Sequence, residues 1–254
     1  MKSRAYAALR SPALAGFAGL MLFALMLELA VAAGWIDRTV VAKPSDMLGA
    51  LPFVHEQLDL IRAFLTTLGV AVAATALAIL VGVPFGYFLY RKREFGLAYE
   101  AWLAAAFAAP LVLLYPLFLV IFGRNLVTLV LMGAIPGLIP ITIHVYQGLR
   151  GVSRTLLDVG HSLNASEHQV FWKIALPAAT PTIFTGIRVG VMYLLINIIA
   201  VEYLINLGGL GRVVSEMAFN FEVPGTYAGI LLVIVVSTMF HAVLGRAERW
   251  LHPH

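Results

Sequence analysis

The first group of polar side chains that could do chemistry lies in residues 156–186, the longest polar interval in the second half of this chain, between two long apolar runs. Their types and spacing form neither a cluster of metal ligands nor a Ser/His/Asp arrangement for nucleophilic attack. We therefore expect no catalytic residue and no bound metal, and we interpret the interval as a surface that a partner protein covers. Its polar residues are Asp158, His161, Asn164, Ser166, Glu167, His168, Gln169 and Lys173.

The composition places this interval in an all-α membrane protein. Of 254 residues, 61% are hydrophobic and 12% are charged, whereas soluble domains carry roughly a quarter charged residues. The apolar runs are apolar on both faces, which excludes the alternating pattern of a β-barrel. The absence of cysteine excludes disulfides and thiolate metal sites. The net charge of +4 comes from scattered basic residues, so it does not indicate nucleic-acid binding.

The apolar runs predict six transmembrane helices, each long enough to cross the hydrocarbon. The first could be a signal peptide, but it is long enough to span, and we interpret it as a retained helix that carries Glu28 near the outer interface or against another helix. Between the first two spans, Ser45 or Asp46 is predicted to cap a short surface helix, Met47–Leu58. The spans cover about residues 13–33, 63–90, 98–122, 126–146, 180–204 and 227–243.

Prolines divide the third and fourth spans, at Pro110 and Pro116 and at Pro136 and Pro140. They predict broken or kinked helices that line a pathway, with simple packing kinks as the alternative. Polar residues inside spans are candidates for lining such a pathway. A packing role is the alternative for His144 and Asn197, and Glu202 is also placed to stabilise the turn that follows it. The pathway candidates are Tyr115, Asn125, His144, Tyr193, Asn197 and Glu202; the turn comprises Gly208, Gly209, Leu210 and Gly211.

The distribution of lysine and arginine predicts the orientation, because cytoplasmic loops carry the excess of positive charge. With six spans, both termini, the loop after the second span and the polar interval share the richer, cytoplasmic side. The richer side holds Lys2, Arg4, Arg10, Arg91, Lys92, Arg93, Arg150, Arg154, Lys173, Arg246 and Arg249, and the other side holds Arg38, Lys43, Arg124 and Arg212. We expect residues 1–62 to form the first helix and a periplasmic segment, and residues 63–250 to form a core of five spans.

Inside the polar interval the sequence predicts two short helices joined by a turn. The first covers Thr155–Leu163, and Asn164 is a plausible left-handed turn residue. Ser166 can then cap a second helix, Glu167–Ile174, with the glutamate near its positive end. Pro177 is predicted to end that helix, and Pro181 to open the next span. The first helix has an apolar stripe, which a passive loop would not need: Leu156, Leu157, Gly160 and Leu163.

At these residues the chain resembles the permeases of bacterial ABC importers. Their cytoplasmic loop has the pattern EAA-x3-G-x9-I-x-LP, and here Asp158, Val159 and Gly160 stand at EAA, Asn164 at the glycine, and Ile174, Leu176 and Pro177 at the end. The flanks resemble the nitrate, sulfonate, taurine and bicarbonate branch through Pro44–Ser45, Glu202, Gly209–Gly211, Tyr227–Ile230 and Arg246–Trp250. The shorter Asp158 and the exchanges at Val159, Gly160 and Asn164 are departures, although asparagine tolerates a left-handed backbone.

The resemblance implies a type I importer permease fold in the bacterial inner membrane, with loop 155–178 coupling it to ATPase subunits. It implies a second permease, usually an identical copy and otherwise a related chain, two ATP-binding subunits that hold ATP and Mg²⁺, and a periplasmic or lipid-anchored binding protein that delivers a small solute. The solute would be an anion of the branch or a vitamin-like compound. The coupling residues would be Leu157, Asp158, Val159, Gly160, Leu163, Asn164, Ala165, Ser166, Leu176 and Pro177.

The chain itself has no phosphate-binding G-x-x-x-x-G-K-[ST] loop, so we expect no cofactor in it and a separate ATPase. An ion-gradient-driven secondary transporter is the alternative, since it could also use proline-broken spans. Such a transporter would be expected to carry ionisable pairs deep in its bundle or inverted repeats. A membrane-embedded enzyme is the third class, and the lack of a catalytic cluster counts against it.

Overall fold

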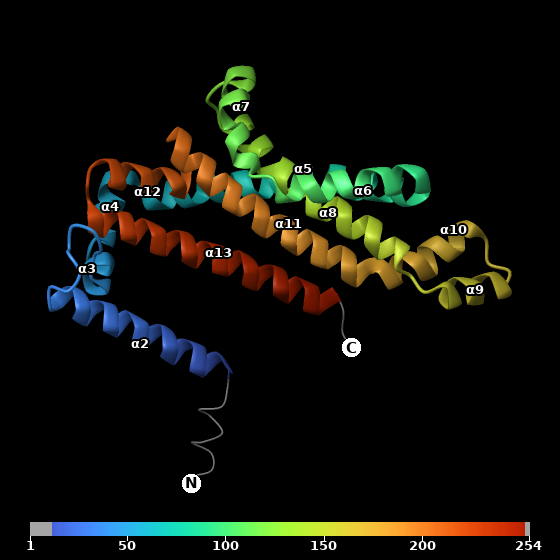
Figure 1. Cartoon of the computed structure of the whole chain (residues 1–254), viewed down its shortest axis with the longest axis horizontal. Helices are drawn as coiled ribbons and strands as arrows, with labels where there is room; N and C mark the ends of the chain where they lie inside the picture. The colour runs from blue at the N-terminus through green and yellow to red at the C-terminus, as the bar shows by residue number, and fades with distance from the viewer. Residues whose placement is uncertain (1–11, 252–254) are drawn as a thin grey trace, which may run out of the picture. The chain divides into compact units, whose positions relative to one another are not determined.

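The computed structural model describes residues 12–251, and throughout this part of the chain every regular element is a helix (Figure 1). This confirms the all-α fold. The basic residues Lys2, Arg4 and Arg10, on which the orientation partly depends, lie outside the described residues. The elements are α2 (Pro12–Ala32), α3 (Pro44–Gly49), α4 (Leu51–Leu58), α5 (Leu60–Arg91), α6 (Arg93–Ala108), η1 (Leu111–Leu114), α7 (Tyr115–Phe122), α8 (Leu126–Arg150), α9 (Arg154–Ser162), α10 (Glu167–Val170), η2 (Phe171–Ala175), α11 (Leu176–Ile205), α12 (Gly209–Phe219) and α13 (Val223–Leu251).

Five helical runs of the described chain are long and apolar enough to cross a membrane, and a bent pair raises the number to six. The pair is α6 and the segment Leu111–Phe122, which meet at an angle of 85°. Pro110 lies at the bend, where it supplies no backbone N–H to continue the helix. The predicted break of the third span is therefore confirmed. The fourth span differs, because Pro136 and Pro140 lie inside one continuous helix, α8.

The packing core of the larger part of the chain is the pair α8 and α11, which lie side by side in Figure 1. Small residues bring the two backbones together: a methyl group on Gly190 would lie 2.7 Å from the carbonyl oxygen of Gly137. On the other face of α8, a methyl group on Gly86 of α5 would lie 2.7 Å from the Thr142 carbonyl oxygen. Because lipid is as apolar as leucine, close van der Waals packing of this kind drives helix association in a membrane.

The described chain divides into two compact units, each with its own packing. One contains the described part of Met1–Ile61 together with Val213–Leu232, and the other contains Arg62–Arg212 and the described part of Val233–His254. The predicted boundary near residue 62 between an N-terminal segment and a five-span core stays a prediction. All the coupling and pathway candidates fall in the second unit.

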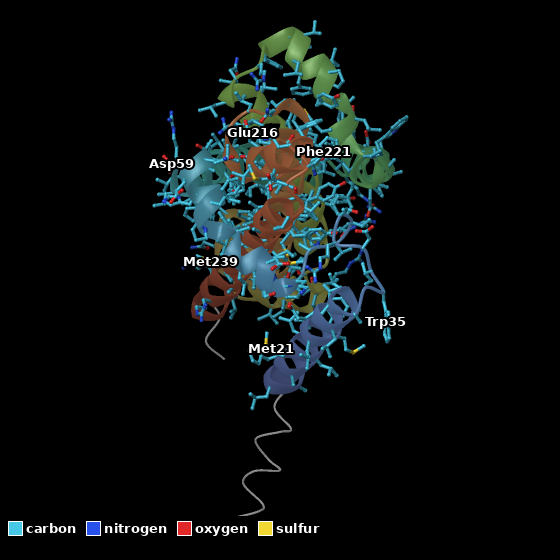
Figure 2. All side chains as sticks on the ribbon, turned by 90° about the vertical axis from the view of Figure 1, so that its left-hand side faces the viewer. Met21, Trp35, Asp59, Glu216, Phe221 and Met239 are labelled. Carbon is cyan, nitrogen blue, oxygen red and sulfur yellow. The ribbon has the colours of Figure 1, made fainter. Side chains whose placement is uncertain are left out.

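One predicted helix cap in the first unit differs from the structure. The prediction that Ser45 or Asp46 caps the surface helix is wrong, since the helix starts at Pro44 and its N-cap residue Lys43 makes no side-chain cap. Instead, Ser45 donates both its backbone N–H and its hydroxyl to the Glu28 carboxylate of α2, at 3.0 and 2.7 Å. This is the contact that Glu28 makes near the end of its span. Beyond that end, Trp35 projects away from the chain (Figure 2).

Candidate functional site

The polar interval folds into a hairpin of α9 against α10 and η2, which we call the polar hairpin (residues 154–175). It lies at one end of the α8–α11 pair in Figure 1. The predicted first helix, Thr155–Leu163, corresponds to α9, Arg154–Ser162. The Phe171 ring lies 5.0 Å from the Tyr87 ring of α5, so the hairpin is also attached to a second membrane helix.

The turn of the polar hairpin contains the left-handed residue and the helix cap that the sequence predicts. Asn164 has a φ of 54°, in the left-handed region, and its N–H donates to the His161 carbonyl oxygen at 2.9 Å. Ser166 then caps the second helix, which confirms that prediction. Its hydroxyl accepts from the Gln169 N–H at 3.3 Å, and the Gln169 side chain accepts from the Ser166 N–H at 2.9 Å. This reciprocal capping box fixes the direction in which the second helix leaves the turn.

Gly160 allows the two arms of the polar hairpin to pack together. A methyl group at Gly160 would lie 2.6 Å from Cδ1 of Ile174 and 3.1 Å from Cγ2 of Val170. Gly160 and Val170 are buried, while the neighbouring residues of both arms are largely exposed. Gly160 therefore belongs to the inside of the hairpin rather than to its outer apolar stripe.

The predicted end of the second helix at Pro177 is wrong. The chain stays helical from Glu167 to Ile205, and Phe171–Ala175 form a π-helical turn just before Pro177. The wider turn accommodates the proline, which has no N–H to donate back into the helix and whose ring needs room. Pro181 likewise lies inside α11 rather than opening it. The polar hairpin is thus joined to the α11 span by continuous helix, without a loop between them.

The outer face of the polar hairpin presents apolar side chains. The exposed fractions are 47% for Leu156, 53% for Val159 and 76% for Leu163. Asp158 and Ser166 are also exposed, and Leu157 and Ala165 are partly exposed. Leu176 is partly buried against the core cluster around Ala179, and Pro177 is exposed at the base of α11. The coupling role of all these residues stays a prediction.

Most pathway candidates form hydrogen bonds with backbone groups of the second unit. The Asn197 amide donates to the Tyr193 carbonyl oxygen at 2.9 Å, one turn earlier in α11, and the Tyr193 hydroxyl donates to the Phe107 carbonyl oxygen at 3.0 Å. His144 Nδ1 lies 2.7 Å from the Pro140 carbonyl oxygen. Asn125 caps α8 by accepting from the Thr128 N–H at 3.1 Å. Tyr115 begins α7 and is partly exposed. The structure does not bring these side chains into one cluster, and their pathway role stays a prediction.

Glu202 is fully buried against the glycine-rich turn. Its carboxylate accepts from the Thr67 hydroxyl, 2.9 Å from each oxygen, and from the Gly211 N–H at 3.0 Å. The Thr67 oxygen in turn accepts from the Leu210 N–H at 2.9 Å. Gly208 and Gly209 both have positive φ, and α12 begins at Gly209. Glu202 thus binds the turn directly, which is the turn-stabilising role that the sequence predicts for it.

Arg188 of α11 and His241 of α13 are polar residues inside spans that were not among the candidates. Their side chains lie 3.1 Å apart, between Arg188 Nη2 and His241 Nε2. The signal that could have found them is an arginine in the interior of an apolar run, which is rare and usually functional. No spacing rule predicts the histidine partner, because it lies on a different span.

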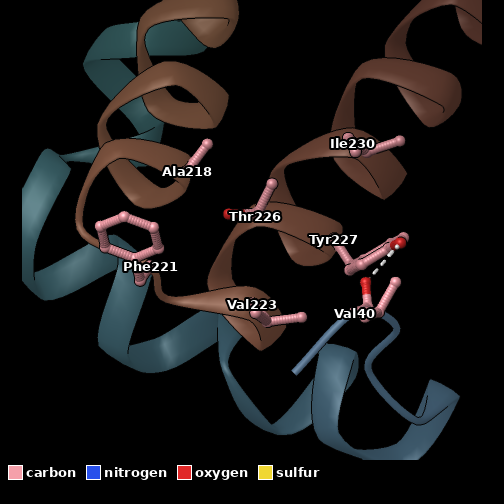
Figure 3. A pocket seen from close by; sticks show the side chains of 7 residues that line it. All are labelled: Val40, Ala218, Phe221, Val223, Thr226, Tyr227 and Ile230. Carbon is pink, nitrogen blue, oxygen red and sulfur yellow. Dashed lines mark hydrogen bonds between the residues drawn. The ribbon is translucent and has the colours of Figure 1, made fainter. Parts of the chain in front are cut away.

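The first unit contains one open pocket of about 290 Å³ beside the start of α13 (Figure 3). Its lining is mostly apolar, and the Tyr227 hydroxyl donates to the Val40 carbonyl oxygen at its edge, at 3.1 Å. None of the side chains that line it is an acid or base that is charged at neutral pH, so it offers no ionic anchor for a charged ligand. Its lining residues are Val40, Ala218, Phe221, Val223, Thr226, Tyr227 and Ile230.

The sequence of this chain is similar to that of known membrane transport proteins. Residues 74–253 match a family described as "Binding-protein-dependent transport system inner membrane component". The formylaminopyrimidine transport permease protein ThiX of Halalkalibacterium halodurans is 26% identical over 86% of this chain and 89% of its own length. The putative aliphatic sulfonates transport permease protein SsuC of Bacillus subtilis is 27% identical over 78% of this chain and 68% of its own.

A solved structure shows the same fold. The inward-facing MetNI methionine ABC transporter contains a chain that matches 76% of this chain and 96% of its own, with a TM-score of 0.65 and 18% identity. At that identity the likeness concerns the fold alone. It confirms the prediction of a type I importer permease fold.

Proposed function

This chain belongs to the family of binding-protein-dependent transport system inner membrane components, and from that membership we propose that its polar hairpin is the docking surface for a separate ATPase subunit. The chain is a multi-pass permease subunit of an ABC importer, a class in which ATP hydrolysis occurs on another polypeptide. ATP and Mg²⁺ would be held by that partner. A binding protein outside the membrane would deliver the solute.

The observation that carries the proposal is that the polar hairpin is held together by internal contacts while it exposes apolar side chains. Its fold is held by buried and backbone contacts, at Gly160, Asn164 and the Ser166 cap, while Leu156, Val159 and Leu163 are exposed. Apolar side chains on a rigid, otherwise polar surface are typical of a protein interface. Continuous helix from Glu167 to Ile205 would carry a movement of this surface directly into the α11 span.

The wider assembly follows from the same proposal. Two copies of the permease would enclose the pathway, in the bacterial inner membrane, with both termini and the polar hairpin on the cytoplasmic side. The named relatives transport formylaminopyrimidine, aliphatic sulfonates and, for RibX of Chloroflexus aurantiacus, riboflavin. The solute of this chain would accordingly be a small polar compound within that range.

The test is Leu163→Asp in the complex of this chain with its ATPase subunit. Because Leu163 is exposed, the change should leave the permease folded but place a charge in the interface, so we expect at least about a tenfold loss of co-purified ATPase subunit. The loss of vanadate-sensitive ATPase activity should follow. Lys92→Asp introduces the same side chain at an exposed position outside the polar hairpin and is the control, which should keep the complex.

Transport provides the second readout. In proteoliposomes supplied with the binding protein, uptake of taurine, methanesulfonate or riboflavin should require the ATPase subunit and ATP. Uptake by the permease alone, driven by a proton or sodium gradient, would show an ion-gradient-driven secondary transporter instead. A Leu163→Asp permease that still assembles and still stimulates the ATPase would refute the docking assignment.

A further inference from the structure

Three consecutive cations lie between α5 and α6, and we call them the basic corner (Arg91, Lys92 and Arg93). Arg91 ends α5, Lys92 stands between the two helices, and Arg93 begins α6. All three are exposed, and within the described residues their side chains form no hydrogen bond or ion pair. Surface charges are mostly solvated, so the groups around the basic corner decide whether it binds a partner.

The nearby carboxylates leave the basic corner positively charged. Glu94, in the first turn of α6, can balance one of the three cations. Glu100, further along the same helix, is already engaged by α8. Its carboxylate lies 3.3 Å from Nη1 of Arg150 and accepts from Nε2 of Gln147, also at 3.3 Å. The corner therefore attracts an anion that these two acidic residues do not replace.

A row of aromatic rings passes the basic corner from α5 to α6, and we call it the aromatic row (Phe85, Phe88, Phe95, Tyr99 and Trp102). Ring centroids are 6.3 Å apart for Phe85 and Phe88, and 5.7 Å apart for Phe88 and Phe95. Those of Phe95 and Tyr99 are 6.3 Å apart. Phe95, Tyr99 and Trp102 are spaced four and three residues apart, so they share one face of α6. Four of the rings are exposed, and the exposed fraction of Trp102 is 74%.

The two surfaces together fit a phospholipid better than a protein partner. A protein that covered the basic corner would account for its charge, but the aromatic row continues along α6 into an apolar, membrane-spanning segment. Exposed aromatic side chains of a membrane protein lie at the interface and against the acyl chains. The cations at the start of α6 consequently lie at the level of the lipid headgroups, where lysine and arginine attract anionic lipids.

We propose that the basic corner binds the phosphate group of an anionic phospholipid and that an acyl chain of this lipid lies along the aromatic row. The two guanidinium groups present paired N–H donors that match phosphate oxygens, and the lysine adds a point charge. Trp102 lies nine residues beyond Arg93, or about 14 Å along the helix. That is close to half of the hydrocarbon thickness of about 30 Å, so one lipid reaches both.

Quenching of Trp102 fluorescence by brominated lipid tests the proposal. The full-length chain carries Trp35→Phe, Trp172→Phe and Trp250→Phe, which leaves Trp102 alone of the four tryptophans. The vesicles are phosphatidylcholine with a minor fraction of either phosphatidylglycerol or phosphatidylcholine that is brominated in the middle of the acyl chain. We expect brominated phosphatidylglycerol to be enriched at Trp102 at least about fivefold over brominated phosphatidylcholine, since each nearby lysine or arginine strengthens anionic-lipid binding by about that factor.

Matched variants separate local charge from net charge. Replacing all three residues of the basic corner by glutamine should abolish the preference for phosphatidylglycerol. Arg38→Gln, Arg154→Gln and Lys173→Gln together remove the same charge from separated, exposed positions and should retain the preference. Added salt should weaken the preference of the unsubstituted corner, because exposed charges are screened.

Four results would overturn the proposal. Equal quenching by the two brominated lipids would show that no anionic lipid is bound, and a preference that survives in the corner variant would place the attraction elsewhere. Soluble glycerol phosphate that removes the preference at constant ionic strength would indicate a site for free phosphate. Loss of the ATPase subunit from the corner variant, with an unchanged lipid preference, would indicate a protein interface. The Leu163→Asp docking test is independent of all four, so a failure of the proposed function is recognised separately.

Discussion

At the scale of single residues, the choice of amino acid is most tightly constrained where Glu202 contacts the glycine-rich turn. Gly209 has a φ of +70°, and a methyl group on it would occupy the space of the Glu202 carboxyl group. Gly211 is equally constrained, since a methyl group there would meet the Ile199 carbonyl oxygen. Both the positive φ and the close approach require glycine. The motif Gly209–Gly211 therefore has a packing reason that can be measured.

We predict that Gly209→Ala destabilises the permease by about 2 kcal/mol or more, because it adds backbone strain and displaces the Glu202 carboxylate. Thermal unfolding in detergent measures the loss. Gly69→Ala in α5 is the matched control: nothing lies within 4 Å of its added methyl group, so it should be neutral or stabilising by up to about 1 kcal/mol. Equal unfolding temperatures for the two variants would contradict the packing argument.

Thr67 supports a second prediction on the same contact. Thr67→Val keeps the shape of the side chain but removes the donor to Glu202 and the acceptor for the Leu210 N–H, which should cost about 1–3 kcal/mol. Thr67→Ser keeps the hydroxyl and should lose much less. The comparison is made by unfolding in detergent. If valine and serine behave alike, the hydroxyl does not hold the turn.

These residues also show what the sequence alone could predict. The local chemistry of Asn164 and Ser166 was readable, since a left-handed turn residue and a cap depend on neighbours within a few positions. The partner of Glu202 was not, because Thr67 lies 135 residues away along the chain. Ser45 was misassigned for the same reason: a distant carboxylate, Glu28, takes the donors that a local rule gives to a cap.

At the scale of elements, the apolar runs predicted the spans well and their joints less well. Each predicted span lies within a helix or a bent pair of helices, with ends displaced by a few residues or more. The prolines behaved differently from one another: Pro110 marks a bend, Pro136 and Pro140 leave α8 continuous, and Pro177 is accommodated by a π turn. Whether a proline breaks a membrane helix depends on the neighbours that satisfy the freed carbonyl groups, and the sequence does not state them.

The polar hairpin gives the prediction that belongs to this scale. Gly160→Leu should force α9 away from Val170 and Ile174, so we expect the complex with the ATPase subunit to be lost while the permease still inserts into the membrane. Gly160→Ala should be milder, because its methyl group meets the flexible end of Ile174. Co-purification and membrane fractionation provide the two readouts. Full assembly of Gly160→Leu would mean that the two arms need not pack together.

At the scale of the whole molecule, the bent pair determines which side of the membrane each later segment reaches. If α6 and Leu111–Phe122 together cross once, the polar hairpin lies on the same side as the Arg91–Arg93 loop. If the pair enters and leaves on one side instead, α8 crosses in the opposite direction and the hairpin emerges outside. Docking of a cytoplasmic ATPase is compatible only with the first arrangement, so topology and function are tested by the same measurement.

We predict that single cysteines replacing Lys92 and Ser162 are labelled from the cytoplasmic side, and one replacing Leu126 from the opposite side. All three positions are exposed, and the chain contains no other cysteine to react. An impermeant maleimide is applied to intact cells and to inverted membrane vesicles, since each preparation presents one face of the membrane. Labelling of residues 92 and 126 from one face and 162 from the other would mean that the bent pair is re-entrant. In that case the polar hairpin could not couple to an ATPase, whatever the resemblance of its residues.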